Sequence, residues 1–107
     1  LIRANKGYRF FRLEWFILWY MREVERILKA LANRRRLEIL WYLKEQKEAT
    51  VTAIASKIKL SFKATSKHLS VLYGADIVDR QQRSLQMFYR LHSDIHPIAK
   101  YISNSRE

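Results

Sequence analysis

Four lysines lie close together in the middle of the chain, in a stretch without acidic residues. The stretch is bounded by Glu48 and Asp76 and contains Lys57, Lys59, Lys63 and Lys67. Lysine ammonium groups donate hydrogen bonds to phosphate oxygens and to the acceptor atoms on the edge of guanine. The whole chain shares this bias, with 21 Lys and Arg against 10 Asp and Glu and a formal net charge of +11. The pattern indicates binding to a polyanion, and to nucleic acid first of all.

Side chains that could carry out catalysis or redox chemistry are sparse by comparison. Ser93, Asp94 and His96 are neighbours in sequence, but a catalytic triad needs convergence in space and an oxyanion site. The chain has no cysteine, which excludes disulfides, thiolate metal sites and thiol redox sensing. It also lacks a glycine-rich phosphate loop. We therefore expect a binding protein that is not an enzyme and that needs no cofactor.

Length and composition predict one mainly helical domain over residues 1–107. The 107 residues are 49% hydrophobic and include only two Gly and one Pro, which suits a single core and few turns. Helical spacing predicts a first helix from Phe10 to Ala32, the candidate dimerisation helix. A second helix, capped by Asn33, is expected to end near Lys44. A short strand at Thr50 and Val51 follows.

The basic stretch itself predicts two short helices joined by a tight turn at Lys59 and Leu60. Thr52 can cap the first, from Ala53 to Ile58, and Ser61 is a natural N-cap for the second, from Phe62 to Tyr73. Gly74 and Asp76 then end the second helix. Together these elements predict a helix-turn-helix over residues 52–73.

The period of the apolar residues changes after this point from a helical one to one close to two. Two strands of a hairpin are expected, Ile77 to Gln81 and Gln86 to Leu91, with Gln82 to Leu85 between them. Ser93 or Asp94 can cap a last helix, residues 94–103, with Pro97 in its first turn. The fold class is therefore mainly α with a small β-hairpin, an α+β winged helix-turn-helix with the wing over residues 77–91.

The second helix of the pair has an apolar stripe and a basic face. Thr65, Leu69 and Leu72 form the stripe that should face the core. The residues away from it are the candidate DNA contacts, namely Phe62, Lys63, Ser66, Lys67 and Ser70. The lysines could bond guanine or phosphate, Ser66 a base edge or phosphate, and Phe62 a thymine methyl group. The alternative is a solvated basic face of a small helical domain.

The first helix is apolar on every side between Trp15 and Met21. One core-facing stripe does not require Phe16, Leu18 and Trp19 as well, so the helix meets a second chain, is surrounded by its own chain, or rests on a membrane surface. The stretch is seven residues long. A membrane-crossing helix needs about 20. We therefore expect an intracellular, cytoplasmic protein.

Three segments resemble the ArsR-like winged-helix repressors. The first, Leu28 to Leu40, is similar to that family's entry helix. The second, Ile54 to Leu72, is similar to its turn and recognition helix, and the third, Ile77 to Leu91, to its wing. The resemblance includes Arg36-Leu37, Leu60-Ser61, Ser66-Lys67-His68-Leu69 and Phe88-Tyr89-Arg90-Leu91. Two residues depart from the pattern, because Lys59 and Ser84 stand where glycines are common. Phe62 is also more apolar than the usual residue.

The resemblance implies a homodimer that binds an operator with two-fold symmetry. It places the interface on the first and last helices, here at Trp15, Leu18, Trp19, Ile98, Tyr101 and Ile102. The implied DNA contacts are Ser61, Phe62, Lys63, Ser66, Lys67 and His68 in the recognition helix and Arg80 and Arg83 in the wing.

The resemblance also raises a metal half-site at Asp94 and His96. A tetrahedral site would need two further ligands, and only Glu107 lies near the required place. We expect Asp94 to cap the last helix and His96 to lie on the surface, with no metal bound.

The function expected from the sequence is specific binding to double-stranded DNA by a homodimeric transcriptional repressor on a palindromic operator. The alternative is a winged-helix protein-interaction module of a larger transcription or replication assembly, with non-specific nucleic-acid contacts. Binding to double-stranded RNA is a third hypothesis, disfavoured because a helix cannot enter the narrow RNA major groove.

Overall fold

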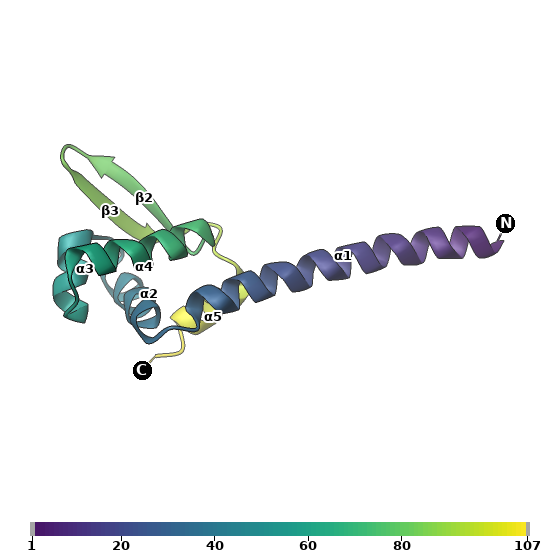
Figure 1. The fold of residues 1–107 in the computed structure, drawn as a ribbon, viewed down its shortest axis with the longest axis horizontal. Coiled ribbons are helices and arrows are strands. Elements are labelled where there is room, and N and C mark those ends of the chain that lie inside the picture. Colours follow the sequence, from purple (N-terminus) through teal and green to yellow (C-terminus); the bar gives the residue numbers. More distant parts are fainter. Residues whose placement is uncertain (1, 107) are drawn as a thin grey trace.

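The computed structural model describes residues 2–106, with side chains from residue 12 onward. Five helices and three short strands follow one another along the chain (Figure 1). Their bounds are α1 Ile2–Leu31, α2 Arg34–Gln46, β1 Ala49–Thr50, α3 Val51–Ile58, α4 Phe62–Gly74, β2 Val78–Arg83, β3 Gln86–Leu91 and α5 Pro97–Ser103. The structure thus has the mainly helical class and the hairpin that the sequence predicts.

The strands form one antiparallel sheet in the order β1-β3-β2. β3 pairs with β2 from Leu91, opposite Val78, to Gln86, opposite Arg83, and with β1 at Tyr89, opposite Ala49. The hairpin is longer than predicted because its turn contains only Ser84 and Leu85. Ser84 takes a positive φ of 58°, which allows this tight reversal.

The core lies where α2, α3 and α4 meet the base of the hairpin. Ile39, Leu40, Ile54, Leu69 and Leu72 are all fully buried there. Thr65 is also fully buried, which confirms the predicted stripe of Thr65, Leu69 and Leu72 on α4. The stripe fixes which side of α4 faces outward.

α1 runs from the core out to one side of the molecule (Figure 1). Its last turns carry the buried residues Ile27, Ala30 and Leu31, and α5 packs beside this end. The helix is longer than the predicted Phe10 to Ala32. The side chain of Phe10 lies outside the described residues.

Local hydrogen bonds confirm two predicted caps and correct a third. Asn33 Oδ1 accepts from Arg36 N at 3.1 Å, and Ser61 Oγ accepts from Ala64 N at 3.1 Å, as expected. The cap of α3 is Thr50 and not Thr52, because Thr50 Oγ1 accepts from Ala53 N at 3.2 Å. β1 is accordingly Ala49–Thr50, one residue earlier than predicted, and α2 continues to Gln46.

The predicted start of the last helix is wrong. Residues 93 and 94 form a turn in which Asp94 N donates to His92 Nδ1 at 3.0 Å. The helix begins only at Pro97, and His96 is its cap, since His96 Nδ1 accepts from Ile98 N at 3.1 Å. Asp94 therefore does not cap α5, and His96 is half-buried rather than on the open surface.

Candidate nucleic-acid interface

The turn between α3 and α4 sets the direction of the recognition helix. Lys59 adopts the left-handed conformation, with φ 56° and ψ 52°, at the place where a glycine is common. Leu60 N donates to Ala55 O at 3.0 Å, and the Leu60 side chain packs against the core. Ser61 then caps α4. The turn expected from the sequence thus forms without glycine.

The N-terminal half of α4 presents a basic and aromatic surface. Phe62 is 60% exposed, and Lys63, Lys67 and Ser70 are also exposed, while Ser66 is half-buried. Lys63 and Lys67 are one helical turn apart on the same side of the helix. In the part of the chain that the structure describes, neither lysine side chain forms an ion pair or hydrogen bond. Both ammonium groups are available to an external anion.

His68 is turned toward α2 instead. It is half-buried, and its Nδ1 lies 3.2 Å from Arg36 Nη1. Burial, followed by the charges of Arg36 and Arg35, lowers the pKa of His68 below its ordinary value of 6.5. The ring is therefore neutral at neutral pH, and Nδ1 accepts the hydrogen bond from Arg36.

Two neighbouring arginines join α2 to the helices around it, which sequence reasoning missed. Arg36 Nε donates to Ala30 O at 2.6 Å, so Arg36 links the end of α1 to His68 on α4. Arg35 donates to the carbonyl of Ile58, the last residue of α3. The pair therefore holds both helices of the helix-turn-helix.

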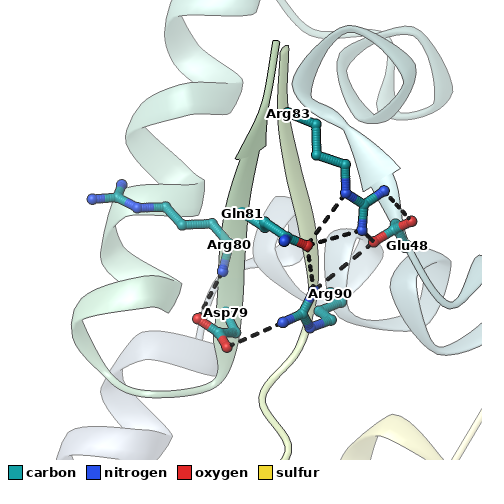
Figure 2. A network of polar contacts seen from close by, with 6 residues as sticks. All are labelled: Glu48, Asp79, Arg80, Gln81, Arg83 and Arg90. Carbon is teal, nitrogen blue, oxygen red and sulfur yellow. Dashed lines mark hydrogen bonds and ion pairs between the residues drawn. The ribbon is translucent and has the colours of Figure 1, made fainter. Parts of the chain in front are cut away.

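The wing arginines Arg80 and Arg83 lie on opposite faces of the hairpin (Figure 2). Arg80 points toward α4, where its guanidinium carbon lies 3.9 Å from the centre of the Tyr73 ring. Its pKa is raised, first of all by a hydrogen bond to Tyr89. Stacking uses the face of the guanidinium, so donors at its edge remain for other partners.

Arg83 belongs to a cluster on the other face of the sheet, which we call the wing network: Glu48, Asp79, Gln81, Arg83 and Arg90 (Figure 2). Arg83 Nη1 and Nη2 donate to the two carboxylate oxygens of Glu48 at 2.9 and 2.7 Å. Its Nε and Nη2 also donate to Gln81 Oε1, at 3.2 and 3.0 Å.

The rest of the wing network surrounds the same carboxylate. Arg90 Nη1 lies 3.9 Å from Glu48 Oε2, and Arg90 Nη2 lies 3.6 Å from Asp79 Oδ2. The Arg83 hydrogen bond, together with the charges of Arg83 and Arg90, lowers the pKa of Glu48. Sequence reasoning did not predict that Glu48 contacts the wing, because it lies 35 positions before Arg83.

The predicted interface residues divide into an exposed group and an inward-facing group. Trp15, Leu18, Trp19 and Tyr101 are 47% to 76% exposed. Ile98 and Ile102 are half-buried and pack against the core. Trp41 Nε1 donates to Ile102 O at 3.0 Å and ties α5 to α2. An apolar surface on α1 and α5 is thus left open by the chain's own fold.

The metal half-site at Asp94 and His96 would need further ligands to hold a metal ion. Among residues 2–106, no group of three or more His, Cys, Asp or Glu side chains could hold a metal ion. Glu107 lies outside the described residues. The described helices also include none with the length and hydropathy needed to cross a bilayer.

Comparisons with known proteins identify relatives of this arrangement. The family model for bacterial regulatory proteins of the arsR family matches residues 33–80, from the cap of α2 into β2. The transcriptional activator HlyU of Vibrio cholerae is 39% identical over 67 residues, which make up 63% of this chain and 61% of HlyU. The sequence match thus spans less than two thirds of that relative.

Solved structures extend the similarity to 80% of the chain. Reduced HlyU from Vibrio cholerae superimposes with a TM-score of 0.71 and 31% identity, over 80% of this chain and 87% of that one. A second similar structure is the homodimeric winged helix-turn-helix DNA-binding domain of a possible ArsR-family transcriptional regulator from Mycobacterium bovis. It superimposes with a TM-score of 0.71 and 30% identity, over 80% of this chain and 77% of that one. The chain therefore belongs to the ArsR family of bacterial regulatory proteins and has a winged helix-turn-helix fold.

Proposed function

We propose that the protein regulates transcription by binding double-stranded DNA as a homodimer, with α4 of each copy in the major groove. The observation that carries this proposal is the outer face of α4. Its exposed side chains Phe62, Lys63 and Lys67 lie at the N-terminal half of a helix whose other face is locked into the core. That half of a recognition helix is the part that contacts base edges.

The roles of individual residues follow from the exposure of each side chain and from the contacts it already makes. Lys63 and Lys67 are assigned to guanine or phosphate, and Phe62 to a thymine methyl group. Ser61 and Ser66 can donate to a phosphate or a base edge. Arg80 is assigned to a phosphate beside the wing. His68 faces Arg36, so we assign it to the support of α4 rather than to the DNA.

The homodimer is supported by the exposed side chains of α1 and α5. Trp15 and Tyr101 are 64% and 76% exposed, and large apolar side chains left exposed together mark interaction surfaces. A second copy would cover them and bring two recognition helices to successive major grooves. Repression then follows when the dimer occludes a promoter in the cytoplasm.

The experiment is selection of bound sequences from a random duplex pool at about 0.15 M salt, where weak phosphate-only binding is largely suppressed. The proposal expects a palindrome with half-sites about one helical turn, 10 base pairs, apart. Recovery of no motif, with binding that disappears as salt rises, would contradict it.

The aromatic surface of α1 also favours a second candidate, a module that binds another protein and only tracks nucleic acid. The oligomeric state separates the two. A homodimer that Trp19→Glu dissociates supports the regulator, since a charge buried in an interface without a partner is costly. A wild-type monomer would support the interaction module.

A further inference from the structure

Glu48 holds the side chain of Arg83 by both of its terminal nitrogens, Nη1 and Nη2 (Figure 2). Arg83 is the last residue of β2, directly before the turn at the tip of the wing. To reach Glu48 the guanidinium crosses β3, where it lies 4.6 Å from the centre of the Phe88 ring. The Arg83 side chain thus reaches from β2 across β3 to the residue that precedes β1.

The carboxylate of Glu48 offers Arg83 the same geometry as a phosphate group. Both present two oxygens that accept parallel hydrogen bonds from one guanidinium, and arginine binds either in this two-point manner. Gln81 Oε1 occupies Nε as well, at 3.2 Å. Arg83 therefore cannot bind a phosphate in this manner without leaving Glu48.

The position of the wing does not depend on this ion pair. The hairpin is held by the ladder from Val78 and Leu91 to Arg83 and Gln86, and Val78 and Tyr89 are buried against the core. The ion pair is partly exposed, with Glu48 at 33% and Arg83 at 44%. Ion pairs at that exposure contribute little to stability.

Glu48 also places a negative charge on the sheet face that bears Arg83 and Arg90. Such a charge repels a DNA phosphate in addition to occupying the arginine. Both effects act in the same direction. An amide of the same size removes the charge and leaves only one acceptor oxygen, so it cannot hold Arg83 by two parallel hydrogen bonds.

We infer that Glu48 is an internal competitor for DNA phosphate, which keeps Arg83 from binding the DNA backbone and thereby limits the sequence-independent affinity of the wing. This inference rests on the proposed function, because it concerns the same DNA-binding surface. It assigns Glu48 a role in specificity, since sequence discrimination is the ratio of specific to non-specific affinity.

The test measures binding of the full chain to a mixed-sequence duplex as a function of salt. Glu48→Gln frees Arg83 to make one phosphate contact. The slope of log affinity against log salt concentration is therefore expected to steepen by about 0.9, and binding to tighten about fivefold at about 0.15 M salt. Arg83→Gln alone leaves the slope unchanged, because that arginine is already occupied. In the double variant the slope returns to the wild-type value.

Glu45→Gln is the matched control, since this exposed glutamate in the last turn of α2 makes the same change in net charge. Equal effects of Glu45→Gln and Glu48→Gln would overturn the inference and leave the proposed function intact. So would weaker binding by Glu48→Gln, which would make Glu48 a positioning residue, or a slope reduced by Arg83→Gln alone. If no variant binds any duplex, the proposed function fails and the inference falls with it.

Discussion

The outer face of α4 and the wing are both rich in basic side chains, but they differ in what those side chains already touch. On α4, Lys63 and Lys67 are exposed, and within the described residues neither forms an ion pair. On the wing, Arg83 and Arg90 are paired with acids of the wing network, and Arg80 lies over Tyr73. Net charge alone therefore overstates how many cations this surface can offer to DNA.

The difference has a topological cause. α4 packs on the core through one buried stripe, and within the described residues the side chains of Lys63 and Lys67 on its opposite side have no ion-pair partner. The wing strand β3 lies between β2 and β1, which brings the acid preceding β1 next to the arginine that ends β2. A sheet in this order brings acidic residues from a distant part of the sequence next to the wing arginines, whereas the lysines on the outer face of α4 have no such neighbour within the described residues.

The largest effect is expected from removing a side chain that packs α4 against the core. Leu69 is fully buried, so Leu69→Ala is expected to lower the free energy of unfolding by about 2 to 5 kcal/mol. Val71→Ala is the control, because this residue of the same helix is 43% exposed, and its cost should stay within about 0.5 kcal/mol. Urea unfolding measures both. Equal losses would contradict the assignment of the two faces of α4.

The second effect concerns the free cations of α4. Lys67→Ala is expected to weaken binding to the selected site by about 1 to 3 kcal/mol and to relax the preference at one base pair. Lys44→Ala, an exposed lysine in the last turn of α2, removes the same charge away from α4. Competition binding with single-base variants of the site measures the preference. Wild-type affinity of Lys67→Ala would remove this residue from the interface.

The sequence predicts the structure of α4 well, because the residues that determine its start and its buried face are close together in the sequence. The Ser61 cap and the Thr65, Leu69 and Leu72 stripe act over three or four residues, and the structure has both. Even the turn at Lys59 follows from its position in the pattern. The assignment of individual residues to DNA remains a prediction.

The wing network could not be predicted in the same way. Glu48 and Arg83 meet only because β1 lies beside β3, a pairing that no local pattern encodes. The error at the start of α5 has a different cause. Serine and aspartate are the usual N-caps, whereas here a histidine nitrogen takes that part just before Pro97.

The third effect distinguishes Arg80, which stacks on Tyr73, from Arg83, which is paired with Glu48. Arg80→Ala is expected to weaken binding to all duplexes alike, by about fivefold at about 0.15 M salt, and to flatten the salt slope by about 0.9. Arg106→Ala is the control. The guanidinium carbon of Arg106 also lies over an aromatic ring, 5.4 Å from the centre of the Trp41 ring, but Arg106 is not part of the wing. A change confined to one base pair would make Arg80 a base contact.

The smallest effect tests the support of α4 by Arg36. Because the pKa of His68 is lowered in the folded protein, the unfolded chain takes up this proton first as the pH falls below about 6.5. Acid therefore favours unfolding, and the contribution of neutral His68 to stability is present above that pH and lost below it. His68→Gln should flatten the pH dependence of the free energy of unfolding between about pH 7.5 and about pH 5, whereas His92→Gln, at the end of the wing, should leave the His68 component in place. If His68→Gln unfolds with the wild-type pH dependence, His68 is not buried against α2 beside Arg36, and it becomes again a residue to test against DNA.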